Sequence, residues 1–144
     1  MVSETPISNS IVVESIPSAI TDVCRQILSK LDDYGFSKED TFAVHLALEE
    51  AFSNAIMHGN KMDPTKEIRI IYSLDPDKIE ISVEDQGGGF EPETVPDPRF
   101  GKKLFEPDGR GLLLMQAYMD VVEFNEQGNT VHMVRYKEKP PFTG

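Results

Sequence analysis

The chain contains 144 residues, of which 39% are hydrophobic and 27% charged, and 14 Lys and Arg against 25 Asp and Glu give a net charge of −11. A chain of this size buries about 68–70% of its unfolded surface, which predicts one globular domain over residues 1–144 rather than a disordered acidic tail. The negative charge disfavours binding to nucleic acid or to anionic membranes, because both need clustered Lys and Arg.

Targeting and metal signals are weak in this sequence. No stretch approaches the ~20 apolar residues of a membrane span, and residues 1–10 lack the pattern of a signal peptide, so we expect a cytoplasmic protein. One cysteine, Cys24, excludes an internal disulfide, and the three histidines lie too far apart in sequence to suggest a metal site. The apolar neighbours of Cys24 favour a buried or half-buried residue over a reactive thiol.

The first part of the chain predicts one strand and two helices. Residues 11–15 are mostly β-branched and apolar, which favours a strand. Apolar residues then recur every three or four positions until Gly35, as in an amphipathic helix. Residues 37–40 resemble a capping box, so a second helix is expected to start there and to continue over the apolar-rich residues 42–57, with Gly59 as its C-terminal cap.

The second part of the chain predicts four strands and one helix. The strands are expected at residues 67–72, 78–83, 121–124 and 130–136. Residues 91–108 are rich in proline and lack periodicity, so we expect a lid loop, and residues 112–119 form a short apolar helix. This order predicts a two-layer α/β sandwich, with helices on one face of a mixed, mostly antiparallel sheet.

The second helix carries two polar residues inside an apolar run. Glu50 and Asn54 are four residues apart and share a face with the small residues Ala43 and Ala47. One interpretation is that Glu49 and Glu50 form the solvated side of an amphipathic helix. The other is chemical, because an amide oxygen ligates Mg²⁺ and a carboxylate one turn away orients or deprotonates a nucleophile.

A first glycine cluster follows the strand at residues 78–83. Asp85 lies at the strand end, and Gly87 and Gly89 belong to three consecutive glycines that would let the backbone approach a ligand closely. The carboxylate of Asp85 can accept a hydrogen bond from the exocyclic amine of a base. The same residues are also compatible with an ordinary turn.

A second glycine cluster stands directly before the last helix. The amides of Gly109, Arg110 and Gly111 and the positive end of that helix would form an anion site, to which Arg110 adds charge. Gly109 is equally compatible with a simple loop end. The combination is more specific than its parts: a helix with Glu and Asn, a DxGxG after a strand, a lid, and a GxG that opens a helix.

That combination resembles the GHKL ATP-binding superfamily over about residues 42–136. Residues 50–59 are similar to its N box, residues 85–90 to its first glycine box and residues 109–112 to its second. The resemblance implies a Bergerat-type sandwich with Asn54 on Mg²⁺, Asp85 on the adenine amino group, and residues 109–111 on the phosphates of ATP. It also implies a place near adenine for Thr130, which is otherwise an ordinary β-branched strand residue.

Within the superfamily, the chain resembles the standalone anti-sigma-factor serine kinases, because 144 residues leave no room for the extra domains of gyrase, Hsp90, MutL or histidine kinases. The resemblance implies that Glu50 orients or deprotonates a serine of a STAS-domain anti-sigma antagonist for attack on the γ-phosphate of ATP. It also implies that the protein can hold a sigma factor. Members of this group are often homodimers, and the strand at residues 11–15 could pair across a twofold axis.

The residues before the second glycine box depart from the pattern of these kinases. Residues 106–108 are Glu-Pro-Asp, where such kinases can carry a basic residue. Arg110, Lys102 or Lys103 would then have to supply the charge, although a lysine pair in a loop is usually just solvated. A non-catalytic, nucleotide-gated module that sequesters its partner is therefore the alternative, and a partner other than a sigma factor is a third hypothesis.

Overall fold

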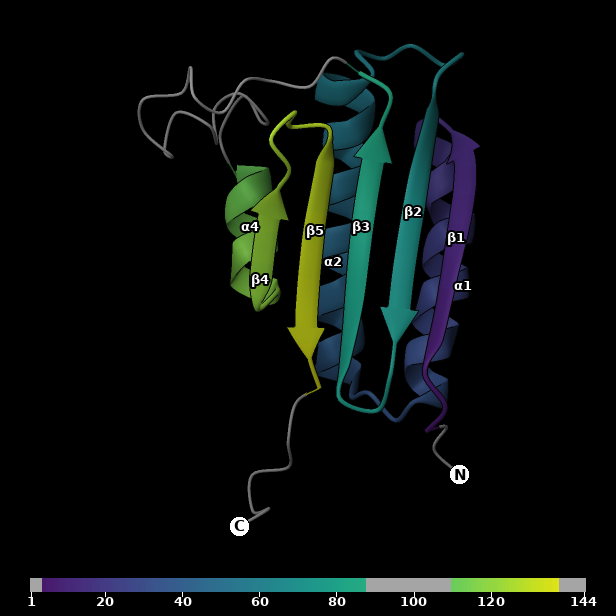
Figure 1. Ribbon diagram of the computed structural model, residues 1–144, viewed down its shortest axis with the longest axis vertical. Coiled ribbons are helices and arrows are strands. Elements are labelled where there is room, and N and C mark those ends of the chain that lie inside the picture. The colour runs from purple at the N-terminus through teal and green to yellow at the C-terminus, as the bar shows by residue number, and fades with distance from the viewer. Residues whose placement is uncertain (1–3, 88–109, 138–144) are drawn as a thin grey trace.

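The computed structural model describes residues 4–87 and 110–137. The helices and strands in chain order are β1 (Ile7–Glu14), the 3-10 turn η1 (Pro17–Ala19), α1 (Ile20–Asp33), α2 (Lys38–Asn54), the π-helical turn η2 (Ala55–Gly59), β2 (Glu67–Leu74), β3 (Lys78–Asp85), α4 (Arg110–Tyr118), β4 (Val121–Phe124) and β5 (Thr130–Tyr136) (Figure 1). None of the helices in this part of the chain is long and apolar enough to cross a membrane.

The described strands form one sheet with the helices behind a single face (Figure 1). The strand order is β1-β2-β3-β5-β4, and each neighbouring pair is antiparallel. This arrangement confirms the predicted α/β sandwich. A mixed sheet was expected, but β4 lies at the edge beyond β5, so it never pairs with β3 and no parallel contact arises among these strands.

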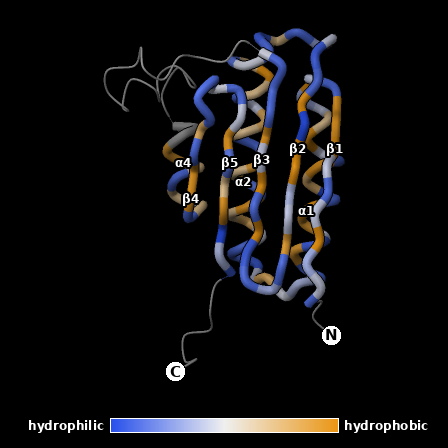
Figure 2. The backbone as a smooth tube through the Cα atoms, in the orientation of Figure 1, coloured by the Kyte–Doolittle hydropathy of each residue, from blue (hydrophilic) through white to orange (hydrophobic). Residues whose placement is uncertain are grey.

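Alternation along the central strands decides which residues face the helices. In β2 and β3 every second side chain is buried, and the buried series of β3 runs Ile79, Ile81, Val83, Asp85. Figure 2 shows hydrophobic residues recurring along these strands and along the two long helices that pack behind them. The alternation therefore places one carboxylate at the end of an otherwise apolar series, on the helix-facing side.

Strand β1 is longer than its apolar pattern predicts. Its polar first half, which includes Ser8 and Ser10, pairs with β2 opposite Ser73 and Ile71. The backbone of β2 supplies this pairing whatever the side chains are, so the strand extends four residues further toward the N-terminus than expected. Ser15 lies outside it, although its N–H still donates to the carbonyl of Lys66 at 3.0 Å.

Helix α2 begins at the predicted capping box, with Ser37 as its N-cap and Lys38 as its first residue. Both hydrogen bonds of the capping box between Ser37 and Asp40 are present. Asp40 is fully buried and accepts from Arg135 Nε at 2.9 Å, while Arg135 Nη1 donates to the Tyr118 carbonyl at 2.6 Å. Arg135 on β5 therefore fastens the start of α2 to the C-terminal end of α4.

The expected cap at Gly59 is wrong. Gly35 follows the end of α1 and has the left-handed conformation of such a cap, with a φ of 77°. Gly59 is not among the residues with positive φ. Helix α2 instead passes into the π-helical turn η2, and the left-handed conformation is adopted two and three residues later by Lys61 and Met62, with φ of 52° and 62°. Gly59 is the last residue of this π-helical turn, a rare conformation that is often found at functional sites.

Cys24 is confirmed as a buried residue, with 6% of its surface exposed. Burial, followed by the negative charge of Glu49, raises the pKa of its thiol to about 11. The thiolate is the reactive form, so we expect Cys24 to stay unmodified by a disulfide reagent such as DTNB in the native protein at pH 8. Stoichiometric labelling should appear only after unfolding in guanidinium chloride. Rapid labelling of the native protein would contradict this assignment.

Candidate functional site

The residues singled out in the sequence gather at one end of the molecule. Asn54 is the last residue of α2, Asp85 the last of β3, Arg110 the first of α4 and Thr130 the first of β5. These ends of the four elements lie together at the upper end in Figure 1. The fold therefore brings residues from four separate stretches of sequence to one edge of the sandwich.

The two acids of α2 have different surroundings. Glu49 is exposed and lies 3.1 Å from His45 Nε2, one turn away. Glu50 is half-buried, and Asn54, one turn beyond it, is 92% buried. Ala43 and Ala47 are buried on the same helix, which packs against α4. The solvated-face interpretation therefore fits Glu49, whereas Glu50 and Asn54 occupy a more enclosed side of α2.

Asp85 sits in a cradle made by two glycines. It is 8% exposed, and its Oδ1 accepts a hydrogen bond from Gly87 N at 2.8 Å. A Cβ added to Gly59 would lie 2.1 Å from Asp85 Oδ2, and one added to Gly87 would lie 1.7 Å from the Gly59 carbonyl oxygen. No side chain fits at either position without displacement, so Gly59 serves close packing of η2 against the end of β3.

The position of Asp85 alters its acidity. Burial raises the pKa of this carboxyl to about 6, against the smaller lowering effects of the Gly87 hydrogen bond and of Lys66, while Glu84 raises it slightly. At neutral pH the group is therefore ionised but poorly hydrated. Such a carboxylate is a strong acceptor for a ligand N–H that replaces the missing water.

Thr130 does not join this cluster. The next residue, Val131, is buried on the helix-facing side, so alternation turns Thr130 toward the opposite face of the sheet. There it lies opposite Glu84, and its hydroxyl donates to Asn129 Oδ1 at 3.3 Å. It is the backbone of Asn129 that reaches Asp85, because its carbonyl accepts from Asp85 N at 2.9 Å.

The second glycine box is described only in part. Arg110 and Gly111 are the first two residues of α4, whose first turn supplies unpaired backbone N–H groups that favour an anion. Gly89, Gly109, the predicted lid at 91–108 with Lys102 and Lys103, and the acidic residues 106–108 lie outside the described residues.

A metal at this end would have few protein ligands. Over residues 4–87 and 110–137 no group of three or more His, Cys, Asp or Glu side chains is placed to hold an ion. Mg²⁺ is commonly bound by only one or two protein oxygens together with substrate phosphates and water. The amide of Asn54 fits that kind of site, and an ion that requires an all-protein cage does not fit it.

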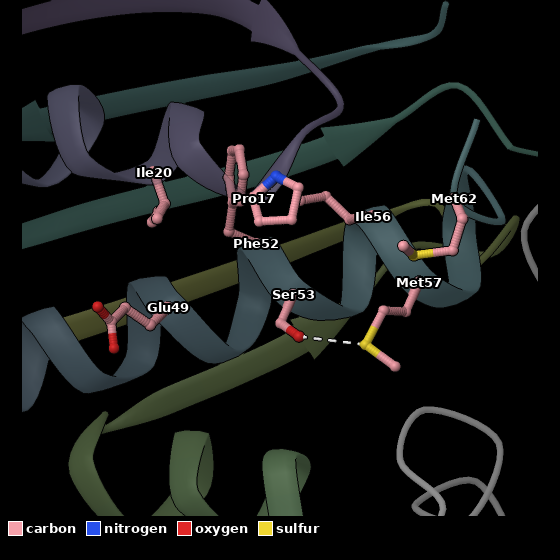
Figure 3. A pocket seen from close by; sticks show the side chains of 8 residues that line it. All are labelled: Pro17, Ile20, Glu49, Phe52, Ser53, Ile56, Met57 and Met62. Atoms are coloured by element: carbon pink, nitrogen blue, oxygen red, sulfur yellow. Dashed lines mark hydrogen bonds between the residues drawn. The ribbon is translucent and has the colours of Figure 1, made fainter. Parts of the chain in front are cut away.

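An apolar pocket of about 260 Å³ lies on another side of α2 (Figure 3). It is lined by Pro17, Ile20, Glu49, Phe52, Ser53, Ile56, Met57 and Met62. Ser53 Oγ lies 3.5 Å from Met57 Sδ at its rim. Glu50, Asn54 and Asp85 are not part of its lining. Helix α2 therefore separates this pocket from the polar residues of the candidate site.

The chain belongs to the histidine kinase-like ATPase domain family, whose model matches residues 13–135. The match contains α2, η2, the end of β3 and the start of α4, which carry the polar and glycine residues described above. The GHKL resemblance is thereby confirmed at the level of the family.

Among curated proteins, the chain is 32% identical over 112 residues to the serine-protein kinase RsbW of Bacillus licheniformis, covering 71% of this chain and 68% of the relative. It is 30% identical over 130 residues to an anti-sigma F factor of Clostridium perfringens, an alignment that covers 79% of this chain and 93% of that protein. A crystal structure of the RsbU and RsbW domains of a Mycobacterium tuberculosis protein aligns with 96% of this chain at a TM-score of 0.64. That likeness, at 17% identity and over 35% of the longer protein, supports the fold.

Proposed function

We propose that this protein is an ATP-dependent protein serine kinase of the anti-sigma type. The observation that carries the proposal is the glycine cradle around the buried, raised-pKa Asp85, at the end of the molecule where Glu50 and Asn54 also lie. The names of the related proteins, serine-protein kinase RsbW and anti-sigma F factor, agree with it.

In this proposal adenine binds at the end of β3. The carboxylate of Asp85 accepts a hydrogen bond from the exocyclic amine, which compensates its lost hydration. Gly87, and Gly89 after it, let the backbone approach the base. Thr130 is left out of the adenine site, because its side chain lies on the other face of the sheet.

The phosphates bind between α2 and the start of α4. Asn54 supplies an amide oxygen for Mg²⁺, which when bound neutralises charge on the phosphate oxygens. Gly109, Arg110 and Gly111 present the amides and the positive end of α4 to the triphosphate. These contacts hold the γ-phosphate in place, and phosphoryl transfer depends mainly on such positioning and charge neutralisation.

Glu50 is the proposed general base. Its carboxylate takes the proton of the partner's seryl hydroxyl as the seryl oxygen bonds to the γ-phosphorus. The bond between that phosphorus and the β–γ bridging oxygen breaks, and ADP leaves with the electron pair. Glu50 is one turn before Asn54 on the same enclosed side of α2, so base and metal ligand are fixed by one rigid element.

The proposed partner is a STAS-domain anti-sigma antagonist that carries the acceptor serine, and a sigma factor is the second partner. The net charge of −11 favours partners with basic surfaces over nucleic acid. A homodimer is also proposed, since β1 is an edge strand of the described sheet and leaves one side of its backbone for pairing.

The proposal is tested by incubating the protein with γ-labelled ATP, Mg²⁺ and a candidate STAS protein, and locating the label by mass spectrometry. We expect phosphate on one serine of the STAS protein, and none when that serine is replaced by alanine. Stable complex formation that depends on ATP but leaves the partner unlabelled would favour the non-catalytic, nucleotide-gated module, which the acidic residues 106–108 support.

Affinity for ATP should fall as the pH drops through about 6, the pKa of Asp85 in the folded protein. Below that value the carboxyl is protonated and loses its acceptor charge, so the contribution of Asp85 weakens by up to about tenfold per pH unit. Calorimetric titration between pH 5 and 8 would measure this. Asp85→Asn is the control. Protonation of the ATP phosphates affects both proteins, whereas the fall in affinity caused by protonation of Asp85 is absent from the variant.

The same group has the opposite effect on the stability of the nucleotide-free protein. Its pKa is raised from 3.8 to about 6, so the folded state binds more protons than the unfolded state between these values. The contribution of Asp85 to the free energy of unfolding therefore decreases as the pH rises through this window. Urea unfolding between pH 3.8 and about 6 should show the free energy of unfolding of the wild type decreasing with pH relative to that of Asp85→Asn.

A further inference from the structure

Asn60 follows the turn η2 directly and is completely buried. Its Nδ2 donates to the carbonyl of Glu67 at 3.1 Å, and its Oδ1 accepts from Gln86 N at 2.8 Å. Its own backbone N–H donates to Ala55 O at 2.7 Å, and its carbonyl accepts from Asp63 N at 3.0 Å. One side chain thus joins the end of α2, the start of β2 and the residue that follows Asp85.

A second amide reinforces the same connection. Gln86 Oε1 accepts from Glu67 N at 2.8 Å, so the N–H of Glu67 is held by Gln86 and its carbonyl by Asn60. The peptide between Asp85 and Gln86 is therefore fixed to η2 and to β2 at once. On the other side, Gly59 packs its Cα against the carboxylate of Asp85.

We infer that Asn60 is a positioning residue that holds η2 in register with the end of β3, and so fixes the placement of Asp85 in the Gly59–Gly87 cradle. The inference rests on the proposed function, in which Asp85 binds adenine. Asn60 acts through the backbone of Gln86 and through Gly59, its neighbour in the chain. It is assigned no contact with the nucleotide.

The chemistry of the position requires an amide. The buried side chain must accept from one backbone N–H and donate to one backbone carbonyl at a fixed separation. Aspartate offers only the acceptor at neutral pH, and alanine offers neither, which leaves Gln86 N and Glu67 O without partners inside the protein. Release of this end of β3 would let the carboxylate of Asp85 shift and hydrate.

The test compares Asn60→Ala and Asn60→Asp with the wild type and with Gly35→Ala, which strains a glycine at φ 77° between α1 and α2, far from this end. We expect the Kd and KM for ATP to rise by about 10- to 100-fold in Asn60→Ala, with kcat at saturating ATP little changed because Glu50 is held by α2. Asn60→Asp keeps an acceptor for Gln86 N but places an unpaired buried carboxylate against the Glu67 carbonyl, so its loss should be at least as large. Gly35→Ala should lose stability but keep its affinity for ATP.

A second readout does not depend on nucleotide. The pKa of Asp85, followed by NMR of its carboxyl carbon, should move from about 6 toward 3.8 in Asn60→Ala as the group hydrates. An unchanged pKa together with unchanged ATP affinity would overturn the inference. Failure of the wild type to bind ATP would instead overturn the proposed function, so the two failures are distinguishable. If Asn60→Ala does not fold, the uncharged variant Asn60→Ser carries the same two measurements.

Discussion

Glu50→Gln is expected to lower the rate of phosphoryl transfer to the partner serine by about 10²–10⁴-fold, the usual contribution of a general base. Glutamine has nearly the same shape and keeps an acceptor oxygen, but it cannot take up the seryl proton. Glu50 is half-buried beside Asn54, so the exchange should leave α2 and the binding of Mg·ATP almost intact. Single-turnover transfer and calorimetry with Mg·ATP would measure the two effects separately.

Glu49→Gln is the matched control for this variant. The two glutamates are neighbours on α2, but Glu49 is exposed and pairs with His45 at the surface. An exposed pair of this kind contributes little, so this variant should retain transfer within about twofold. Transfer by Glu50→Gln at the rate of Glu49→Gln would remove Glu50 from the role of base.

Gly59→Ala is expected to reduce the affinity for ATP by about 10- to 100-fold, because a misplaced binding group commonly has an effect of this size. The added Cβ would lie 2.1 Å from Asp85 Oδ2, so the carboxylate must leave its cradle. Overpacking costs about 1–3 kcal/mol, while replacing glycine by alanine in a helical turn returns up to about 1 kcal/mol. The free energy of unfolding should therefore fall by about 0–3 kcal/mol.

The control for Gly59→Ala is Gly35→Ala. Its φ of 77° makes a side chain unfavourable at that position, so it loses a similar amount of stability without any contact with Asp85. Urea unfolding would measure whether Gly59→Ala and Gly35→Ala have similar free energies of unfolding. Calorimetry would then compare their affinities for ATP. Equal ATP affinities in the two variants would show that the cradle has no part in binding the base.

The local patterns in the sequence predicted the type of each element well. The strands at 121–124 and 130–136 are confirmed residue for residue, because alternation and the turn at Gly128, with a φ of 75°, define both ends. The N-terminal end of β1 and the C-terminal end of α2 were not predicted. The backbone of β2, distant in sequence, pairs with the polar half of β1 and extends it, while α2 passes into the π-helical turn η2, where Gly59 packs on Asp85 of β3.

The candidate site was predictable in its residue types but not in its contacts. Glu50, Asn54 and Asp85 stand out because polar residues interrupt apolar runs. The sequence gives no sign that Gly59 packs on Asp85, since a glycine after a helix is usually a cap. The face of Thr130 depends on the register of β5 with β3, which a single strand does not define.

The contacts of Arg135 have a mechanical consequence for the two ends of α4. At its last residue, Tyr118, α4 is hydrogen-bonded to Arg135 of β5, which also pairs with Asp40 of α2. Its first residue, Arg110, lies at the edge where the triphosphate is proposed to bind. Helix α4 also packs against α2 and places the fully buried Met115 in the core. Arg135 therefore links the end of α4 that lies away from the proposed phosphate site to the start of α2, so one side chain ties together the two helices between which the phosphates are proposed to bind.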